Sequence, residues 1–372
     1  MAKTSESSQA SESSPLAALR PLLGINILLV FLPVAIILRL ADGSDMAIFA
    51  TSALAIIPLA GLIGTATEEI AARTGPQIGG LLNATLGNAA ELIITIFALR
   101  AGLLELVRAS IIGSILGNLL LVMGLAILLG GLKNGIQTFD RRVAIMNATL
   151  LILSFMALAI PSLFDTTFVE EGAFDSELLL SEGIALILIG LYLANIGYSL
   201  ITHRETGAAV EVHHEPQWSQ RLAIGVLIFA TLSIVLMSEF LVGTVEPVVE
   251  ELGWSELFVG VIIVPIIGNV AEHLVAVQQA IKNRMELAMT IALGSSLQIA
   301  LFVAPVLVFI SLLFEDKLIL AFTIPEVVAL AAASYVGSLV AEDGETNWFE
   351  GLMLLGVYLI IALAFFLLPE AA

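Results

Sequence analysis

Long apolar segments, separated by short polar breaks, follow one another along nearly the whole chain. Each segment approaches the roughly 20 residues that an α-helix needs to cross a bilayer, and the breaks contain charged residues, glycine and proline. The pattern predicts eleven membrane-spanning helices. Their expected ranges are 22–40, 46–72, 77–100, 106–130, 142–162, 178–202, 220–245, 256–281, 287–313, 318–339 and 349–368. The expected fold class is therefore an all-α polytopic membrane protein.

The composition agrees with a location in the membrane. Of the 372 residues, 59% are hydrophobic and 13% are charged, and the mean hydropathy is +1.05. A soluble domain usually has about 25% charged residues. The net charge of −19 excludes a basic face for nucleic acid. Residues 1–21 are rich in serine and glutamate, and we expect them to form a disordered tail.

Basic residues are distributed unequally between the two sides of the predicted membrane. Lys3, Arg20, Arg73, Lys133, Arg141, Arg142, Arg204, Arg221, Lys282 and Arg284 fall on the side of the N-terminus, and Arg39, Arg100, Arg108 and Lys317 fall on the other. Because cytoplasmic loops carry the excess of lysine and arginine, we expect the N-terminus in the cytoplasm. An odd number of spans then places the C-terminus outside, together with the acidic loops 165–182 and 246–256.

A five-residue motif occurs twice within apolar segments, as GNAAE at 87–91 and as GNVAE at 268–272, which lie 181 residues apart. A second pair, GSIL at 113–116 and GSSL at 294–297, has the same separation. Two matches at one separation indicate an internal duplication.

The duplication predicts how the chain is divided. The expected parts are a tail at 1–21, a first transmembrane helix at 22–45, a five-helix repeat at 46–202, a cytoplasmic linker at 203–219 and a second five-helix repeat at 220–372. Because five is odd, the two repeats would cross the membrane in opposite senses, as in many secondary transporters.

Each motif ends in a glutamate that lies within an apolar segment, Glu91 in the first and Glu272 in the second. An ionisable residue at membrane depth costs roughly 2.5–3.5 kcal/mol on insertion scales and therefore indicates function. Asn88 and Asn269 lie three residues earlier, on the same helix face as their glutamates. Carboxylate and amide oxygens suit Ca²⁺, Mg²⁺ or Mn²⁺. We expect a cation site with both glutamates as metal ligands, although the asparagines could serve only as interhelical hydrogen bonds.

The second pair of motifs adds polar groups and small residues. Ser114, Ser295 and Gln298 are expected to contribute hydroxyl and amide groups to the same site. Small residues also let helices approach closely. We expect that backbone or packing role for Gly87, Gly268, Gly113 and Gly294.

Four further residues accompany the motifs. Glu68 and Glu239, one in each half, are expected to line an access path. His273 adjoins Glu272 and could relay protons, because its ordinary pKa is near neutrality, or could be a packing residue. Pro265 should loosen its helix and free backbone carbonyls near Asn269.

The longer stretches around the motifs resemble a known family. Residues 79–93, GGLLNATLGNAAELI, resemble the first signature of the calcium/proton exchanger family, a branch of the cation/calcium antiporter superfamily. Residues 268–277, GNVAEHLVAV, and 294–305, GSSLQIALFVAP, resemble its second signature. The resemblance implies eleven helices, two inverted five-helix repeats and a central pair of glutamates that binds Ca²⁺. Sodium/calcium exchangers would instead show a Gly-Thr-Ser-x-Pro-Glu-like signature, which neither half contains.

The glutamate pair itself favours ion exchange. Two carboxylates in a low-dielectric interior cannot both stay charged and empty at modest cost, so either a divalent cation or about two protons must neutralise them. Because these occupancies exclude each other, they couple the two ions. We expect an antiporter, not an enzyme, that exports Ca²⁺ from the cytoplasm in exchange for H⁺ by alternating access. No cofactor is expected beyond the transported cation, Ca²⁺ or Mn²⁺.

Other functions remain as alternatives. The protein could be coupled to Na⁺, prefer Mn²⁺, or be a cation channel, although repeats around a single buried pair favour alternating access. An intramembrane metalloenzyme is weakened by the absence of a histidine pair such as H-E-x-x-H. The expected partners are Ca²⁺, H⁺ and the lipid bilayer, in a bacterial or archaeal cell membrane or in a eukaryotic vacuole. The sequence leaves the oligomeric state open.

We expect cysteines introduced at Ser8 and Ala371 to be labelled from opposite sides of the membrane. The chain has no cysteine of its own, so single-cysteine variants need no further substitution. A membrane-impermeant maleimide, applied to right-side-out and to inverted vesicles, measures the sidedness of each position. Labelling of both from the same side would contradict the odd number of spans and, with it, the inverted repeats.

Overall fold

The computed structural model describes residues 24–74, 79, 82, 85–171, 173–206 and 216–368. The predicted tail at 1–21 and most of the predicted linker at 203–219 lie outside these residues. Within the described part, regular structure is helical except for strands β1 (Gln137–Thr138) and β2 (Glu345–Thr346), which pair antiparallel.

The helical elements follow the apolar segments. They are η1 (Ile25–Val30), α2 (Phe31–Leu40), α3 (Asp45–Thr74), α5 (Ala89–Arg100), α6 (Leu104–Leu116), η2 (Gly117–Val122), α7 (Met123–Asn134), α8 (Arg141–Glu171), α9 (Phe174–Thr206), α10 (Gln220–Val242), α11 (Val245–Leu252), α12 (Glu256–Phe258), η3 (Val259–Ile263), α13 (Val264–Ile281), α14 (Met285–Gln298), η4 (Ile299–Val303), α15 (Ala304–Ser311), α16 (Ile324–Val340) and α17 (Trp348–Leu367). Of the η elements, η1 is a 3₁₀ helix, and the other three are wider π-helical turns inside longer helices.

Eight helices in the described part are long and apolar enough to cross a membrane. Two shorter apolar helices, Ile25–Leu40 and Ile324–Val340, accompany them. The expected class, a mostly helical multi-pass membrane protein, is therefore confirmed. The number of eleven spans stays a prediction, in part because α5 begins close to residues that are not described.

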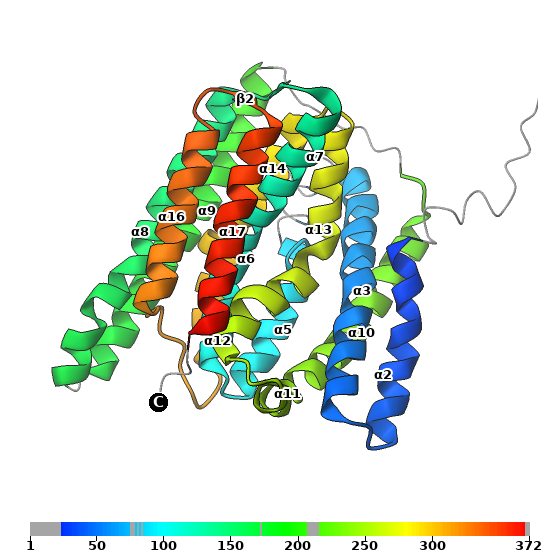
Figure 1. The fold of residues 1–372 in the computed structure, drawn as a ribbon, viewed down its shortest axis with the longest axis vertical. Helices are drawn as coiled ribbons and strands as arrows, with labels where there is room; N and C mark the ends of the chain where they lie inside the picture. The colour runs from blue at the N-terminus through cyan, green and yellow to red at the C-terminus, as the bar shows by residue number, and fades with distance from the viewer. Residues whose placement is uncertain are drawn as a thin grey trace, which may run out of the picture.

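Most helices lie side by side along the long axis of the molecule (Figure 1). α2 packs on α3 at one side, and α3 in turn packs along α10. α8 and α9 pair at the opposite side. α5, α6, α13 and α14 lie between these groups, and the span from Leu104 to Asn134 is the most buried of the eight. The central helices are those that carry the duplicated motifs.

The helix predicted at 318–339 begins later, at Ile324. Thr323 has extended backbone and forms a capping box with Glu326, whose Oε2 accepts the backbone N–H of Thr323 at 2.8 Å. The residues before Thr323 do not need to be helical, because side chains of other helices accept hydrogen bonds from their backbone N–H groups. Ser181 Oγ accepts the N–H of Leu320 at 3.1 Å, and Ser162 Oγ accepts that of Phe322 at 2.8 Å. The sequence Thr-Ile-Pro-Glu was the signal for this later start.

α8 and α9 are longer than the predicted ranges 142–162 and 178–202. α8 has 31 residues and includes Pro161 without ending there. At about 1.5 Å per residue it exceeds the roughly 30 Å of the hydrocarbon layer. The prediction ended the helix where hydropathy falls, whereas the helix continues through polar residues, and the α8–α9 pair extends beyond its neighbours (Figure 1).

Gly113 allows α6 to touch the backbone of η3. A Cβ at this position would overlap the carbonyl group of Val261. That carbonyl lies four residues before Pro265, which has no N–H to bond it. Gly113 therefore packs against the Val261 carbonyl, the group that Pro265 leaves without its helical N–H donor. The predicted packing role of Gly294 is not seen, since a Cβ there would meet nothing within 4 Å.

A polar brace holds the end of α13 at Ile281. Its last carbonyls lack helical partners, as at every helix C-terminus. Gln137 Nε2 donates to Ala280 O at 2.9 Å and to Asn283 Oδ1 at 2.9 Å. Asn134 Nδ2 donates to Ala280 O at 3.1 Å and to Ile281 O at 3.3 Å. Through these bonds the helix that carries Glu272 is fixed to α7 and to the β1–β2 pair, at the upper end in Figure 1.

We expect Gln137→Ala to lower the stability of the protein in detergent. Gln137 is 2% exposed, and its loss leaves buried carbonyl groups with fewer donors, which costs about 1–3 kcal/mol. Thermal unfolding of the purified protein measures the effect, and Ile136→Ala, at a neighbouring residue that is 67% exposed, is the matched control. An equal unfolding temperature for both variants would show that the brace contributes nothing to stability.

Candidate cation-binding site

Glu91 lies in the first turn of α5, a helix that begins in the interior of the protein. The carboxylate is 2% exposed and accepts a hydrogen bond from Ser114 Oγ of α6 at 3.1 Å. The side chain of Asn269 also bonds to it. The start of a helix carries a partial positive charge, which favours a carboxylate at this place.

Glu272 has a matching environment in the second half of the chain. Its Oε2 accepts a hydrogen bond from Ser295 Oγ of α14 at 2.5 Å. In both halves the serine follows the glutamate by 23 residues. Each half therefore builds the same carboxylate–hydroxyl pair, from a helix and the helix that follows it.

The two halves meet at these pairs. Asn88 Nδ2 donates to Gln298 Oε1 at 2.5 Å, and Asn269 Nδ2 donates to Ser114 Oγ at 3.4 Å. Each asparagine thus bonds a residue of the other half. Interhelical hydrogen bonding was the alternative role that the sequence analysis gave for the two asparagines. These bonds do not use the Oδ1 atom of Asn88, a buried acceptor without a hydrogen-bond donor in the described part of the chain.

Gly268 lets α13 approach Glu91. A Cβ at this glycine would lie 2.7 Å from Glu91 Cγ, which is closer than side-chain carbons can pack. The motif therefore begins with glycine in the second half because the glutamate of the first half occupies the space. Gly87 lies in the turn before Asn88, the N-cap of α5.

The two glutamates are close enough to interact electrostatically, but their access to solvent differs. Glu91 is buried and Glu272 is partly exposed. Glu68 on α3 is exposed and interacts electrostatically with Glu272. The structure thus brings Glu68 to the site, on the side of Glu272.

Two predicted participants form no side-chain hydrogen bond to the glutamates in the described part of the chain. Glu239 is exposed in the last turns of α10. His273 is 8% exposed, and its Nε2 atom has no hydrogen-bond partner among the described residues. Their roles as access path and proton relay stay predictions.

The wide turns were not predicted. η2 begins at Gly117 and η4 at Ile299, in the helices that contribute Ser114 and Ser295. π-helical turns within α-helices are frequent at functional sites. Asn118, in η2, is 1% exposed, and its Nδ2 has no acceptor in the described structure. Two prolines, Pro265 and Pro305, follow η3 and η4 closely and were the available sequence signal.

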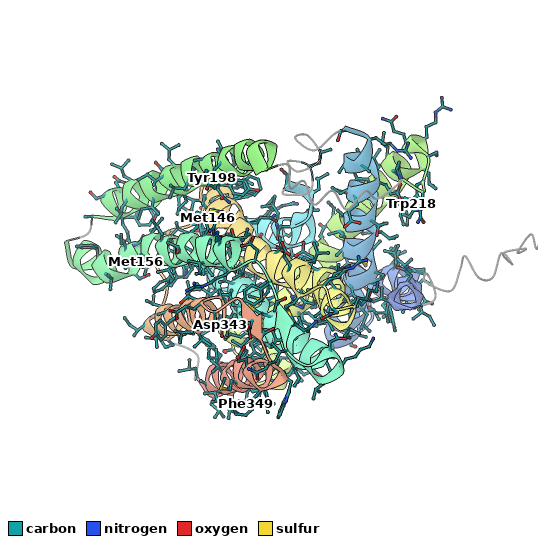
Figure 2. All side chains as sticks on the ribbon, turned by 90° about the horizontal axis from the view of Figure 1, so that it is seen from above. Met146, Met156, Tyr198, Trp218, Asp343 and Phe349 are labelled. Carbon is teal, nitrogen blue, oxygen red and sulfur yellow. The ribbon has the colours of Figure 1, made fainter. Side chains whose placement is uncertain are left out.

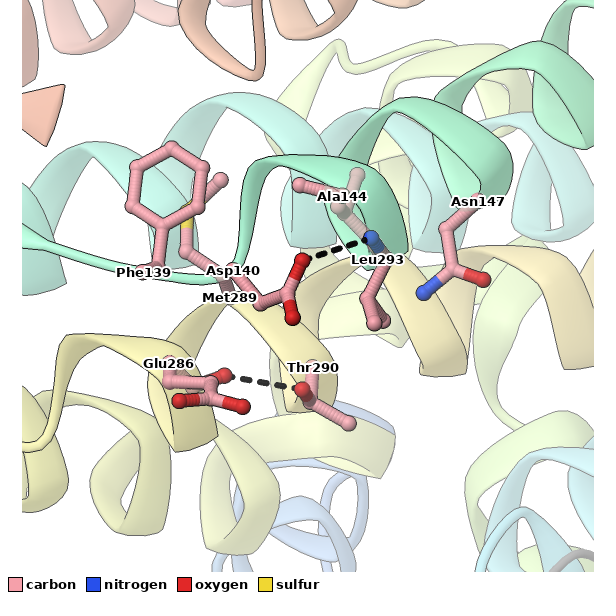
Figure 3. Close-up of a pocket in the computed structure, with 9 residues that line it drawn as sticks. Phe139, Asp140, Ala144, Asn147, Glu286, Met289, Thr290 and Leu293 are labelled. Atoms are coloured by element: carbon pink, nitrogen blue, oxygen red, sulfur yellow. Dashed lines mark hydrogen bonds between the residues drawn. The ribbon is translucent and has the colours of Figure 1, made fainter. Parts of the chain in front are cut away.

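A small pocket lies elsewhere, between the beginnings of α8 and α14 (Figure 3). Asp140 and Glu286 line it, but Asp140 Oδ1 accepts the N–H groups of Arg142 and Val143 at 2.8 and 3.2 Å and so caps α8. The cavity measures about 10 Å³, the space of a single water molecule. It is a feature of helix capping rather than a second site.

Comparison with known proteins agrees with the motifs. A family model described as sodium/calcium exchanger protein matches residues 44–201 and, separately, 222–367. The Ca²⁺/H⁺ antiporter ChaA of Bacillus subtilis is 47% identical over 342 residues, which cover 90% of this chain and 96% of that protein. A Ca²⁺/H⁺ antiporter of Synechocystis is 43% identical and covers 92% of this chain and 97% of its own length.

A solved structure of native YfkE has the same fold. It superimposes with a TM-score of 0.81 at 44% sequence identity, and the match covers 92% of this chain and 100% of the YfkE chain. Since the family model matches most of the chain and the similar proteins match over their whole length, the chain belongs to the sodium/calcium exchanger protein family, in its calcium/proton exchanger branch.

Proposed function

We propose that the protein exports Ca²⁺ from the cytoplasm in exchange for H⁺ by alternating access around Glu91 and Glu272. The observation that carries this proposal is the meeting of two identical carboxylate–hydroxyl pairs, one from each half of the chain. The names of the similar proteins, Ca²⁺/H⁺ antiporters, support the pair of ions and a transporter rather than an enzyme.

The ligands for Ca²⁺ are the oxygen atoms at this meeting point. Glu91 and Glu272 supply charge as the metal ligands, and Asn88, Asn269, Ser114, Ser295 and Gln298 supply neutral oxygens around them. The unused Oδ1 of Asn88 supports this role, because a buried carbonyl without a donor is available to a cation. The similar proteins are named for Ca²⁺, and no contact in the described part favours Mn²⁺.

Proton exchange follows from the charge of the site. Serine and asparagine donate hydrogen bonds but remove no charge, so an empty site retains two carboxylates in the interior. Protons neutralise them without further ligands, whereas Na⁺ would need an oxygen cage of its own. Ca²⁺ and protons therefore compete for the same atoms, and the competition couples their movement.

The exposed Glu68 beside Glu272 supports an opening of the site on one side of the membrane, as one state of an alternating-access cycle would have. Glu272 is partly exposed beside the exposed Glu68, whereas Glu91 is buried under Gly268. Glu68 lies towards the end of α3 at Thr74, the end of the molecule at which α13 also finishes. Under the proposed topology this end faces the cytoplasm, so the site opens inward.

We also propose that eleven helices and two inverted repeats, 46–202 and 220–372, build this site. Separate matches of one family model to 44–201 and 222–367 support a duplicated unit. The equal spacing of the glutamate and serine in both halves supports it as well. Opposite insertion of two such units lets a single site face each side in turn.

We expect Glu91→Gln and Glu272→Gln each to reduce Ca²⁺ flux by at least about tenfold, because removing one member of a buried charged group costs several kcal/mol. Flux of ⁴⁵Ca²⁺ into proteoliposomes with an imposed pH gradient measures the change. Glu251→Gln, at an exposed residue of α11, is the matched control and should transport normally. Near-normal flux in either folded glutamine variant of the pair would refute the central role of the two glutamates.

The counter-ion is tested separately. Ca²⁺ uptake into vesicles should follow an imposed pH gradient and collapse when a protonophore is added, since protons alone are expected to discharge the empty pair. Uptake with a Na⁺ gradient at fixed pH is the comparison. If uptake followed the Na⁺ gradient and ignored the protonophore, the protein would be a sodium-coupled exchanger instead.

A further inference from the structure

Glu68 and Glu69 are neighbours on α3, but they have different surroundings. Glu68 is exposed and interacts electrostatically with Glu272, whereas Glu69 is 2% exposed. Glu69 Oε1 accepts the backbone N–H of Gln217 at 3.1 Å, and Oε2 accepts that of Trp218 at 3.0 Å. Both oxygens of this buried carboxylate therefore hold the backbone of a segment 148 residues later in the chain.

Arg73, one turn further along α3, also binds this segment. Its guanidinium Nη2 donates to the backbone carbonyl of Trp218. Figure 2 shows Trp218 at the edge of the molecule, near the end of α3. Together Glu69 and Arg73 bind both the N–H and the carbonyl of this residue, and we call these three hydrogen bonds the α3 clamp.

The clamped segment leads directly into α10. Ser219 follows Trp218 and is the N-cap of α10, where its Oγ accepts the N–H of Leu222 at 3.3 Å. The first N–H groups of a helix and its dipole favour a carboxylate nearby. Bonds between a carboxylate and backbone N–H groups are stronger than those between neutral groups. The clamp thus fixes where α10 begins relative to α3.

The two helices belong to different halves of the chain. α3 and α10 form the most extensive helix–helix contact in the described structure. α13, which carries Glu272, is instead fixed at its end by Gln137 and Asn134 to α7. The ends of α3 and α13 are therefore held by separate sets of hydrogen bonds, although the two helices also pack against each other, and Glu68 of α3 interacts electrostatically with Glu272 of α13.

We propose that Glu69 is a positioning residue for transport: with Arg73 it ties the start of α10 to the end of α3 and so holds α10 in the place beside Glu68 that transport requires. This inference rests on the proposed function. Glu69 does not touch the ion, and its effect passes through the backbone of Gln217 and Trp218.

The variant Glu69→Gln tests the clamp with little change of shape. Its amide has one acceptor oxygen, and its NH₂ group would face a backbone N–H, so one bond is lost. The maximal rate of Ca²⁺ transport should fall about tenfold, the effect of one hydrogen bond to a charged group. The half-saturating Ca²⁺ concentration should stay unchanged, whereas Glu68→Gln should raise it. Glu251→Gln serves again as the neutral control.

A covalent cross-link distinguishes a positioning role of Glu69 from a general loss of folding in the variant. Ala72 and Gln217 are both exposed, and the Gln217 backbone is bonded to Glu69, three residues before Ala72 on α3, so cysteines at these two positions are within reach of a flexible bifunctional thiol reagent. In the Glu69→Gln background, cross-linking should restore the maximal rate. Continued slow transport after complete cross-linking would overturn the proposal, as would a normal rate in Glu69→Gln itself or a raised half-saturating Ca²⁺ concentration.

Hydrogen exchange of the Gln217 and Trp218 amides gives a readout that does not depend on transport. Exchange should be slow in the wild-type protein and faster in Glu69→Gln, with no change in Glu251→Gln. Equal exchange in wild type and Glu69→Gln would overturn the clamp. A wild-type protein that exchanges no Ca²⁺ for H⁺ would refute the proposed function, and the exchange rates would still decide whether Glu69 holds α10.

Discussion

Negative charge buried at membrane depth is the constraint on which the remaining structure depends. Glu91 and Glu272 receive hydroxyl and amide donors, but these groups are neutral and leave the charge in place. An interior of low dielectric makes that charge expensive unless a cation or protons accompany it. Three features of the structure surround this buried charge. α5 begins at Asn88 next to Glu91, Gly268 leaves space for the Glu91 side chain, and Asn88 donates a hydrogen bond to Gln298 of the other half.

The hydrogen bonds at the helix ends divide the molecule in a way that suits such a site. Gln137 and Asn134 attach α13 to α7 and to the paired strands, and Glu69 with Arg73 attaches the start of α10 to α3. Apolar contact between helices gives little preference for one relative position in a membrane, because lipid is as apolar as leucine. Polar bonds at a few helix ends can therefore decide which helices stay together.

Much of the site was predictable because its chemistry is local in sequence. A buried glutamate in a repeated motif is recognisable from the chain alone, and so is the serine that follows each glutamate at constant spacing. That the halves meet at the glutamates was predicted, but the individual contacts between them were not. The bond from Asn88 to Gln298 and the fit of Gly268 against Glu91 depend on how two distant helices cross, and hydropathy carries no such information.

The fold shows the same distinction. Hydropathy located the long apolar helices, but it misplaced the start of α16, where serines of α8 and α9 satisfy extended backbone, and it ended α8 too early. Glu69 was recognisable as an acid in α3, yet its partners lie beyond an intervening segment of well over a hundred residues. Its partners are backbone N–H groups, which almost every residue has, so the sequence does not identify them.

The contact between Gly268 and Glu91 also limits how the two halves of the gene can diverge. The space next to the glycine is filled by the methylene groups of a glutamate encoded in the other half. A methyl group at 268 fits only if residue 91 becomes shorter by a comparable amount, as in aspartate, and the shorter side chain would place its charge elsewhere. Substitutions at the two positions are thus not independent, because the volume added at one has to be removed at the other.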